Sequence, residues 1–242
     1  MAAYTGYLFV HFTGEEKLGE QIYFALSRDG LHWMDLNEGK PVLVSDIGEA
    51  GVRDPFILRN PLNGKYVIIA TDLRIEAGKG WTAAQEEGSR NLIVWESEDM
   101  VNWDGPFCAE VGIPEAGCVW APEAIFDEKK QAFLVFWASK VKEPGDTESK
   151  QRIYASYTTD FHAFTEPVKY QEGENHIIDT TILKAGDYYY RFSKYETEKN
   201  IRLEKSRSLD KDSFTEVYAP VLNALAGVEG PASFRFNDRE EW

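Results

Sequence analysis

The feature of this chain that most constrains its fold is a turn unit that recurs between short strand-like runs. Each copy has a small hydroxyl residue, then an acid and then an aromatic residue; the four copies read SRDGLHW, SEDMVNW, YTTDFHAF and SLDKDSF. Their closing aromatic residues, Trp33, Trp103, Phe164 and Phe214, lie 70, 61 and 50 residues apart. These intervals are too long for an array of hairpins and fit repeated sheets of about four strands, as in propeller blades. In each copy we expect the aspartate to cap a tight turn.

Strand-like runs fill the intervals between these turns, and helical patterns are nearly absent. The runs are GYLFVHF, QIYFALS, PFILRN, KYVIIATDL, NLIVWES, AFLVFWAS, RIYASYT, YYYRFSKYE and IRLEKSRS. Aromatic residues make up 14% of the chain, which favours strand packing or stacking on carbohydrate over long helices. The sequence therefore predicts an all-β fold, with residues 1–242 forming one propeller domain.

The predicted propeller has five blades, of which the last is incomplete in this chain. Blade-like segments cover about residues 4–40, 52–107, 118–168, 176–218 and, in part, 228–242. An open ring exposes a strand edge and apolar faces. We therefore expect either that the natural protein continues beyond Trp242, or that strands from another chain or a swapped partner complete the ring, with self-association as the result.

Four blade openings each place a carboxylate among apolar and small residues. They read GVRDPFIL, CVWAPEAIF, HIIDTTIL and GVEGPASFRF, and their acids are Asp54, Glu123, Asp179 and Glu229. Alone, the first would indicate a surface turn, because Asp-Pro is a common turn opening. Its recurrence favours a functional cluster in the central funnel, since innermost propeller strands line the funnel and carboxylates are seldom buried there without a role.

In these motifs and their order, the chain resembles glycoside hydrolase family 43, the five-bladed propeller arabinofuranosidases, β-xylosidases and arabinanases. The resemblance covers about residues 50–235 and implies a general base at Asp54, a second aspartate that tunes the acid at Asp179, and the general acid at Glu229. Three departures weaken the transfer of substrate preference. A blade-like segment precedes the base, Thr180 stands where proline is usual, and Glu123 stands where the W-A-P motif usually has aspartate.

Sugar recognition requires flat apolar faces and hydrogen-bonding side chains. Substrate contacts are predicted for two tryptophans, three arginines and the W-A-P acid, and a structural role is the alternative for each. These candidates are Arg53, Arg74, Trp81, Trp120, Glu123 and Arg191.

The resemblance implies an inverting exo-glycosidase that removes terminal α-L-arabinofuranosyl or β-D-xylosyl residues from plant-derived oligosaccharides. Inversion needs an acid and a base about 6.5–9.5 Å apart, a separation that Asp54 and Glu229 could span across a funnel. Two alternatives stay open: a non-catalytic sugar-binding propeller or inactive fragment, and a retaining or phosphorolytic relative. No cofactor is required, although family members often hold a calcium in the central channel, so a structural calcium is compatible with the resemblance.

Charge and hydropathy argue against nucleic acid and membranes as partners and allow a neutral ligand, such as the small oligosaccharide that the resemblance implies. With 26 Lys and Arg against 41 Asp and Glu, the net charge of −15 would repel nucleic acid and anionic membranes. The sequence has no apolar run near the ~18 residues that span a bilayer, and its start, MAAYTGYLFVHF, lacks the basic region of a secretory signal, which predicts a cytoplasmic location. Cys108 and Cys118 are too few for a disulfide framework, and no zinc-ligand spacing occurs.

Overall fold

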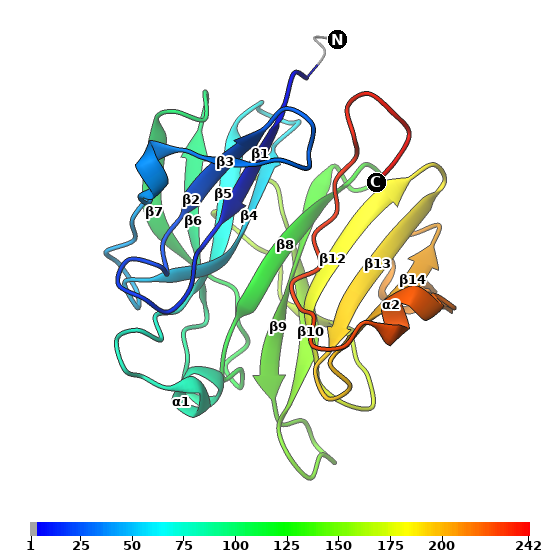
Figure 1. Cartoon of the computed structure of the whole chain (residues 1–242). Coiled ribbons are helices and arrows are strands. Elements are labelled where there is room, and N and C mark those ends of the chain that lie inside the picture. The colour runs from blue at the N-terminus through cyan, green and yellow to red at the C-terminus, as the bar shows by residue number, and fades with distance from the viewer. Residues whose placement is uncertain (1–3) are drawn as a thin grey trace.

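The computed structural model describes residues 4–242, which form fifteen strands in four antiparallel sheets. The sheets are arranged as the blades of a propeller, and within each one consecutive strands are neighbours (Figure 1). The first sheet contains β1 (Tyr7–His11), β2 (Tyr23–Ser27) and β3 (Met34–Asp35). The second contains β4 (Val52–Arg59), β5 (Tyr66–Asp72), β6 (Asn91–Ser97) and β7 (Trp103–Glu110).

The other two sheets have four strands each. The third contains β8 (Trp120–Asp127), β9 (Ala132–Val141), β10 (Lys150–Thr158) and β11 (Val168–Gln171), and the fourth contains β12 (Ile177–Ala185), β13 (Tyr188–Tyr195), β14 (Asn200–Ser206) and β15 (Thr215–Val217). Helices are short: α1 (Trp81–Glu86), α2 (Pro220–Ala224) and the 3-10 turns Asn37–Gly39 and Lys211–Ser213. Within residues 4–242, no helix is long and apolar enough to cross a membrane.

The second sheet is apolar on both faces because it packs between two neighbouring sheets. Ile69 and Val94 join a buried cluster with the third sheet, whereas Ile68 and Trp95 join a cluster with the first sheet. Adjacent residues of a strand point to opposite faces, so a continuous apolar run such as VIIA in β5 buries side chains on both sides. Each fully buried Val, Leu or Ile contributes about 1.5–3 kcal/mol.

Three of the four turn units adopt the same capped turn. In the second copy, Ser97 Oγ accepts the N–H groups of Asp99 and Met100, and Asp99 Oδ1 accepts those of Val101 and Asn102. The copies that begin at Ser27 and Thr158 repeat this arrangement. The fourth copy keeps the Asp210 N–H bond to Ser208 Oγ and the bond between the two side chains, but the Asp210 side chain accepts no backbone N–H group of the described residues.

The predicted fifth blade is not present among the described residues, which form four sheets only. Residues 228–242, expected to begin that blade, contain no strand. They run between the first and fourth sheets (Figure 1) and are held to β1, where Asn237 N–H donates to Tyr7 Oη at 2.6 Å and the Tyr7 and Phe234 rings pack at 5.5 Å. Side-chain contacts with an existing strand therefore replace the ladder that a new blade would need.

Candidate active site

The innermost strands of the second, third and fourth sheets share a bulge near their first residues. Each breaks its pairing register at a residue with left-handed backbone: Asp54 in β4 (φ 48°), Ala121 in β8 (φ 47°) and Asp179 in β12 (φ 47°). A bulge re-aims the side chain beside it and is common next to active sites. The three bulges therefore bring corresponding residues of separate sheets to one place, and two of these residues are aspartates.

The bulges surround a cavity of about 320 Å³ on the axis of the molecule. Its wall includes His11 of β1, Asp54 of β4, Glu123 of β8, Asp179 of β12 and Gly230 of the C-terminal segment. Three of the four predicted acids thus converge on one cavity. Its volume lies at the lower end of the range of about 300–1,000 Å³ for small-molecule sites.

Asp54 is half-buried, and two neighbouring groups favour its ionised form. Burial raises the pKa of Asp54 above its usual range, and the charge of Glu229 adds to this, while the Arg53 guanidinium and a hydrogen bond from Thr71 act in the opposite direction. That hydrogen bond runs from Thr71 Oγ1 to Asp54 Oδ2 at 3.2 Å. A carboxylate with a positive neighbour and a fixed donor is suited to accept a proton.

Glu123 and Asp179 hold their protons to higher pH. Burial raises the pKa of Glu123 to about 8, with a further contribution from Asp179 and an opposing hydrogen bond from Thr181. Burial also raises the pKa of Asp179 to about 7, helped by the charge of Asp54 and opposed by the Gly230 N–H, which donates to Asp179 Oδ2 at 3.1 Å. Buried carboxyls with raised pKa values are typical of catalytic sites.

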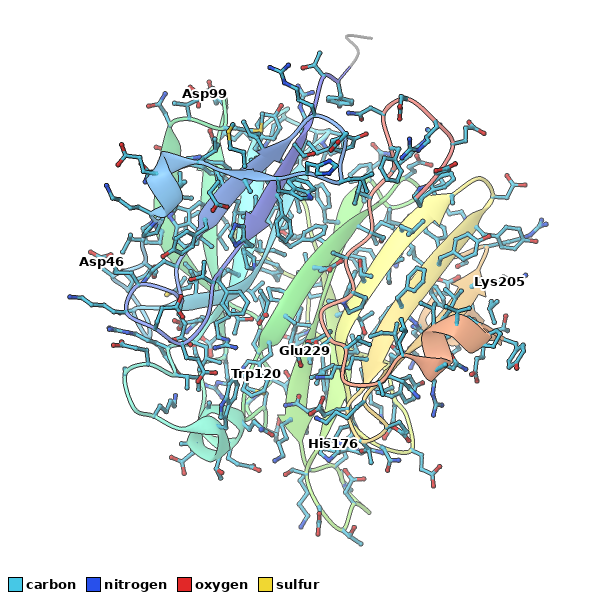
Figure 2. All side chains as sticks on the ribbon, in the orientation of Figure 1. Asp46, Asp99, Trp120, His176, Lys205 and Glu229 are labelled. Carbon is cyan, nitrogen blue, oxygen red and sulfur yellow. The ribbon has the colours of Figure 1, made fainter. Side chains whose placement is uncertain are left out.

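Glu229 lies at the rim of this cluster rather than inside it. Its side chain is 73% exposed, and Glu229 Oε2 pairs with Lys194 Nζ at 2.5 Å. Figure 2 shows Glu229 on the C-terminal segment near the centre of the molecule. The segment is held at the cavity by the hydrogen bond of the next residue, Gly230, to Asp179. The charge of Glu229 acts on the cavity, because it contributes to the raised pKa values of Asp54 and Asp179.

Arg53 and two tryptophans form a wall next to the cavity. The Arg53 guanidinium lies over the rings of Phe12 and Trp81, 4.7 and 4.9 Å from their centroids, and donates to Glu20 Oε1 at 2.9 Å. Trp81 is 43% exposed and meets the edge of Trp120 at 5.9 Å. Arg53 is thus already satisfied by protein groups, and Trp81 is the member that offers an aromatic face to solvent.

The structure places the other two predicted arginines away from the cavity. Arg74 pairs with Glu76 at 2.5 Å and lines a separate hollow with Glu20. Arg191 is buried in the fourth sheet, where it pairs with Glu204 at 2.8 Å and lies over the Phe214 ring. Both side chains use their charge in local ion pairs, which sequence position alone does not show.

Thr71 and Lys194 contact the predicted acids but carried no sequence signal. Thr71 lies in the apolar run of β5, and Lys194 lies on β13 opposite Ile178. Both act across strands, so only the pairing of strands reveals them. Within residues 4–242, no group of three or more His, Cys, Asp or Glu is arranged to hold a metal ion.

Comparisons with known proteins agree with this arrangement. A family model described as a probable glycosyl hydrolase domain, related to family 43, matches residues 2–242. An alpha-L-arabinofuranosidase of Bifidobacterium longum is 34% identical over 98% of this chain and 26% of its own length. The chain thus spans about a quarter of that curated relative.

Solved structures share the fold at low sequence identity. A thermostable family-43 glycoside hydrolase matches with a TM-score of 0.70 and 10% identity, over 98% of this chain and 78% of its own. An endo-1,4-beta-xylanase of Bacteroides thetaiotaomicron matches at 0.64 and 12%, over 96% and 80%. An exo-beta-1,3-galactanase of Phanerochaete chrysosporium matches at 0.62 and 14%, over 90% and 48%.

Proposed function

This chain belongs to the family of probable glycosyl hydrolase domains related to glycoside hydrolase family 43, and on that premise we propose that its axial cavity hydrolyses a glycosidic bond with inversion at the sugar. The observation that carries the proposal is the convergence of Asp54, Glu123 and Asp179 on one cavity from three separate sheets. Placing like charges together is unfavourable, and carboxyl groups with perturbed pKa values cluster at functional sites.

In the proposed reaction, Asp54 is the general base. It takes a proton from a water molecule as that water attacks the anomeric carbon from the face opposite the departing oxygen. Arg53 and Thr71 favour the ionised form that this step needs. Inversion requires space for this water between base and acid, which corresponds to about 6.5–9.5 Å between the two carboxyl groups.

Glu229 is the proposed general acid and gives its proton to the departing oxygen. Its exposed position at the rim suits contact with a leaving group that extends into solvent. To reach that oxygen, the carboxyl must leave Lys194 and turn toward the cavity, while the hydrogen bond from Gly230 to Asp179 keeps the segment in place. Asp179 is the proposed second aspartate of the site, and it positions the acid by accepting the N–H of Gly230, the residue next to Glu229, at 3.1 Å.

The proposed substrate is a terminal α-L-arabinofuranosyl residue of an arabinan- or hemicellulose-derived oligosaccharide, with β-D-xylosyl as the alternative. The identity to an alpha-L-arabinofuranosidase supports arabinose. Exo action is part of the proposal, with the terminal sugar placed in the cavity beside Asp54, Glu123 and Asp179. Trp81 is the proposed stacking surface for the departing part, since its exposed ring stands beside the cavity wall.

One observation favours a second candidate, a sugar-binding propeller without catalysis. The ion pair with Lys194 keeps Glu229 out of the cavity. A chain in which this pair never opens would hold a sugar without a proton donor.

The test is hydrolysis of a panel of nitrophenyl pentosides and arabino-oligosaccharides, with the first-formed anomer identified by proton NMR. We expect inverted arabinose, and we expect Asp54→Asn to lower turnover by about 10² to 10⁴-fold on all substrates. Glu229→Gln should lose less on nitrophenyl glycosides than on natural sugars, because a good leaving group needs less protonation.

Three results would contradict this proposal. Retained product configuration would contradict inversion, and an Asp54→Asn variant with near-normal turnover would remove the base. Binding of arabino-oligosaccharides without any hydrolysis would favour the sugar-binding alternative.

A further inference from the structure

Thr71 is fully buried near the end of β5, and its side chain joins the inner strands of two neighbouring sheets. Thr71 Oγ1 accepts a hydrogen bond from the Ala121 backbone N–H of β8 at 2.8 Å and donates one to Asp54 Oδ2 of β4 at 3.2 Å. Ala121 and Asp54 are the corresponding left-handed residues of their strands. One hydroxyl therefore ties together two strained positions at the cavity.

The direction of these two hydrogen bonds is fixed by chemistry. An amide N–H can only donate, so the Ala121 N–H takes one lone pair of the Thr71 oxygen. The hydroxyl has a single proton, and Asp54 Oδ2 is the acceptor that the described residues provide for it. The hydrogen bond to Asp54 thus needs a carboxylate oxygen with a free lone pair, which favours the ionised carboxylate and sets its orientation.

We propose that Thr71 is a positioning residue for the reaction: its hydroxyl, oriented by the backbone of β8, holds the Asp54 carboxylate ready to accept a proton in the cavity. The proposal rests on the proposed role of Asp54 as the base. Removing the hydroxyl takes this partner away from two groups at the cavity, the Ala121 N–H and Asp54 Oδ2. The Asp54 carboxylate then loses a donor that favours its ionised form and a contact that fixes its orientation.

Other charged and titratable groups also face Asp54 and are kept constant in the test. They share the wall or the rim of the cavity, and they come from five different parts of the chain. They are His11 of β1, Arg53 of β4, Glu123 of β8, Asp179 of β12 and Glu229 of the C-terminal segment.

The test compares Thr71→Val, which keeps the shape and removes the hydroxyl, with Thr71→Ser, which keeps the hydroxyl. We expect Thr71→Val to move the acidic limb of the kcat/KM profile to higher pH by about one unit, which lowers kcat/KM by about 10-fold on the acidic side of that limb. The limb moves to higher pH because Asp54 loses a hydrogen-bond donor that favours its ionised form. Thr71→Ser should restore the profile of the unchanged protein.

The matched control is Thr158→Val, which removes a buried threonine hydroxyl from a turn outside the cavity, where it accepts the Phe161 N–H at 2.9 Å. This variant should lose stability without moving the acidic limb. Should Thr71→Val fail to fold, Thr71→Cys keeps a weak donor and is expected to shift the limb in the same direction by a smaller amount.

A second readout does not depend on activity. Carbon-13 NMR can follow the titration of the Asp54 carboxyl, assigned by the signal that disappears in Asp54→Asn. Its midpoint should rise in Thr71→Val and stay in Thr71→Ser and Thr158→Val. An unchanged midpoint in Thr71→Val would overturn the role of Thr71. If no sugar is hydrolysed, the proposed function fails, and the midpoint still decides the role of Thr71.

Discussion

Three residues of the cavity wall, Asp54, Ala121 and Asp179, have a left-handed backbone. Such a conformation costs a residue on the order of 1–3 kcal/mol and persists only where the surrounding structure holds it. Here the paired strands on both sides of each bulge do so. Two of the positions carry a carboxylate and the third carries a methyl group, and all three residues line the cavity.

At the residue scale, Glu123 makes the stability of the fold depend on pH. Its pKa is raised from the ordinary value of 4.5 to about 8, so the folded chain keeps a proton that the unfolded chain releases at lower pH. Folding therefore takes up a proton between these two values, and stability falls as pH rises through this window. The loss of stability is complete once the pH exceeds the pKa of Glu123 in the folded chain.

We expect Glu123→Gln, which cannot lose this proton, to be more stable than the unchanged chain at pH 9, by on the order of 2–4 kcal/mol. At pH 5 the two proteins should differ little, and this comparison serves as the control. Urea unfolding at both pH values measures the difference. If the two proteins differ in unfolding free energy by the same amount at pH 5 and pH 9, the pKa of Glu123 is the same in the folded and unfolded chains, and the prediction is wrong.

At the scale of elements, the capped turns fix where each outer hairpin ends. Ser97 illustrates this, because its Oγ donates to the Asn102 carbonyl at 2.6 Å and accepts the N–H groups of Asp99 and Met100. The side chain thus satisfies three backbone groups that the strands β6 and β7 leave unpaired. Each hydrogen bond of this kind contributes about 0.5–1.5 kcal/mol to stability.

Ser97→Ala should therefore lower the free energy of unfolding by roughly 1–3 kcal/mol. Ser149→Ala is the control, because the Ser149 hydroxyl makes one exposed contact, at 3.4 Å to Glu86, and its removal should change stability by less than about 0.5 kcal/mol. Denaturant unfolding of both variants measures the difference. Equal stabilities for the two variants would show that the capped turn contributes little.

Strands and turns were the part of this fold that the sequence could predict, because their signals are local. The apolar runs and the turn units lie within a few residues of each other along the chain, and the turns at Ser27, Ser97 and Thr158 are confirmed. The bulges could not be predicted, since a register break depends on the partner strand. Thr71 shows the same limit for the site: within KYVIIATDL it reads as one more strand residue.

At the scale of the whole molecule, the prediction of a fifth blade exceeded what the described residues form. The motif GVEGPASFRF matched the other blade openings, but it contacts β1 through Phe234, and through Asn237 directly after it, instead of starting a sheet. A strand needs a neighbour to pair with, and a sequence motif does not supply one. The carboxylate motif and the strand are therefore separable features, as residues 228–242 show.

The first sheet leaves large apolar side chains at the surface. Phe9, Trp33 and Met34 are 45%, 40% and 66% exposed, and Phe234 beside them is 42% exposed. Exposed apolar groups near an unpaired strand edge promote association between chains. The proposed partner at this face is a second copy of the chain.

We expect the 242-residue chain to self-associate as its concentration rises, and we expect Met34→Lys to reduce this. Met100→Lys is the control, because Met100 is also partly exposed but lies on a turn of the second sheet. Light scattering over a concentration series measures the mass. A monodisperse monomer at every concentration would contradict the expectation.

The convergence of carboxyls from separate sheets also has a consequence for the order of events when the chain folds. Each sheet is built from consecutive strands, so it can form as soon as its own residues have left the ribosome. Asp54, Glu123 and Asp179 then belong to three sheets that are not yet packed, where each carboxyl is hydrated and free of its neighbours' repulsion. The electrostatic opposition arises only when the sheets pack around the axis, in the same step that forms the apolar clusters between neighbouring sheets.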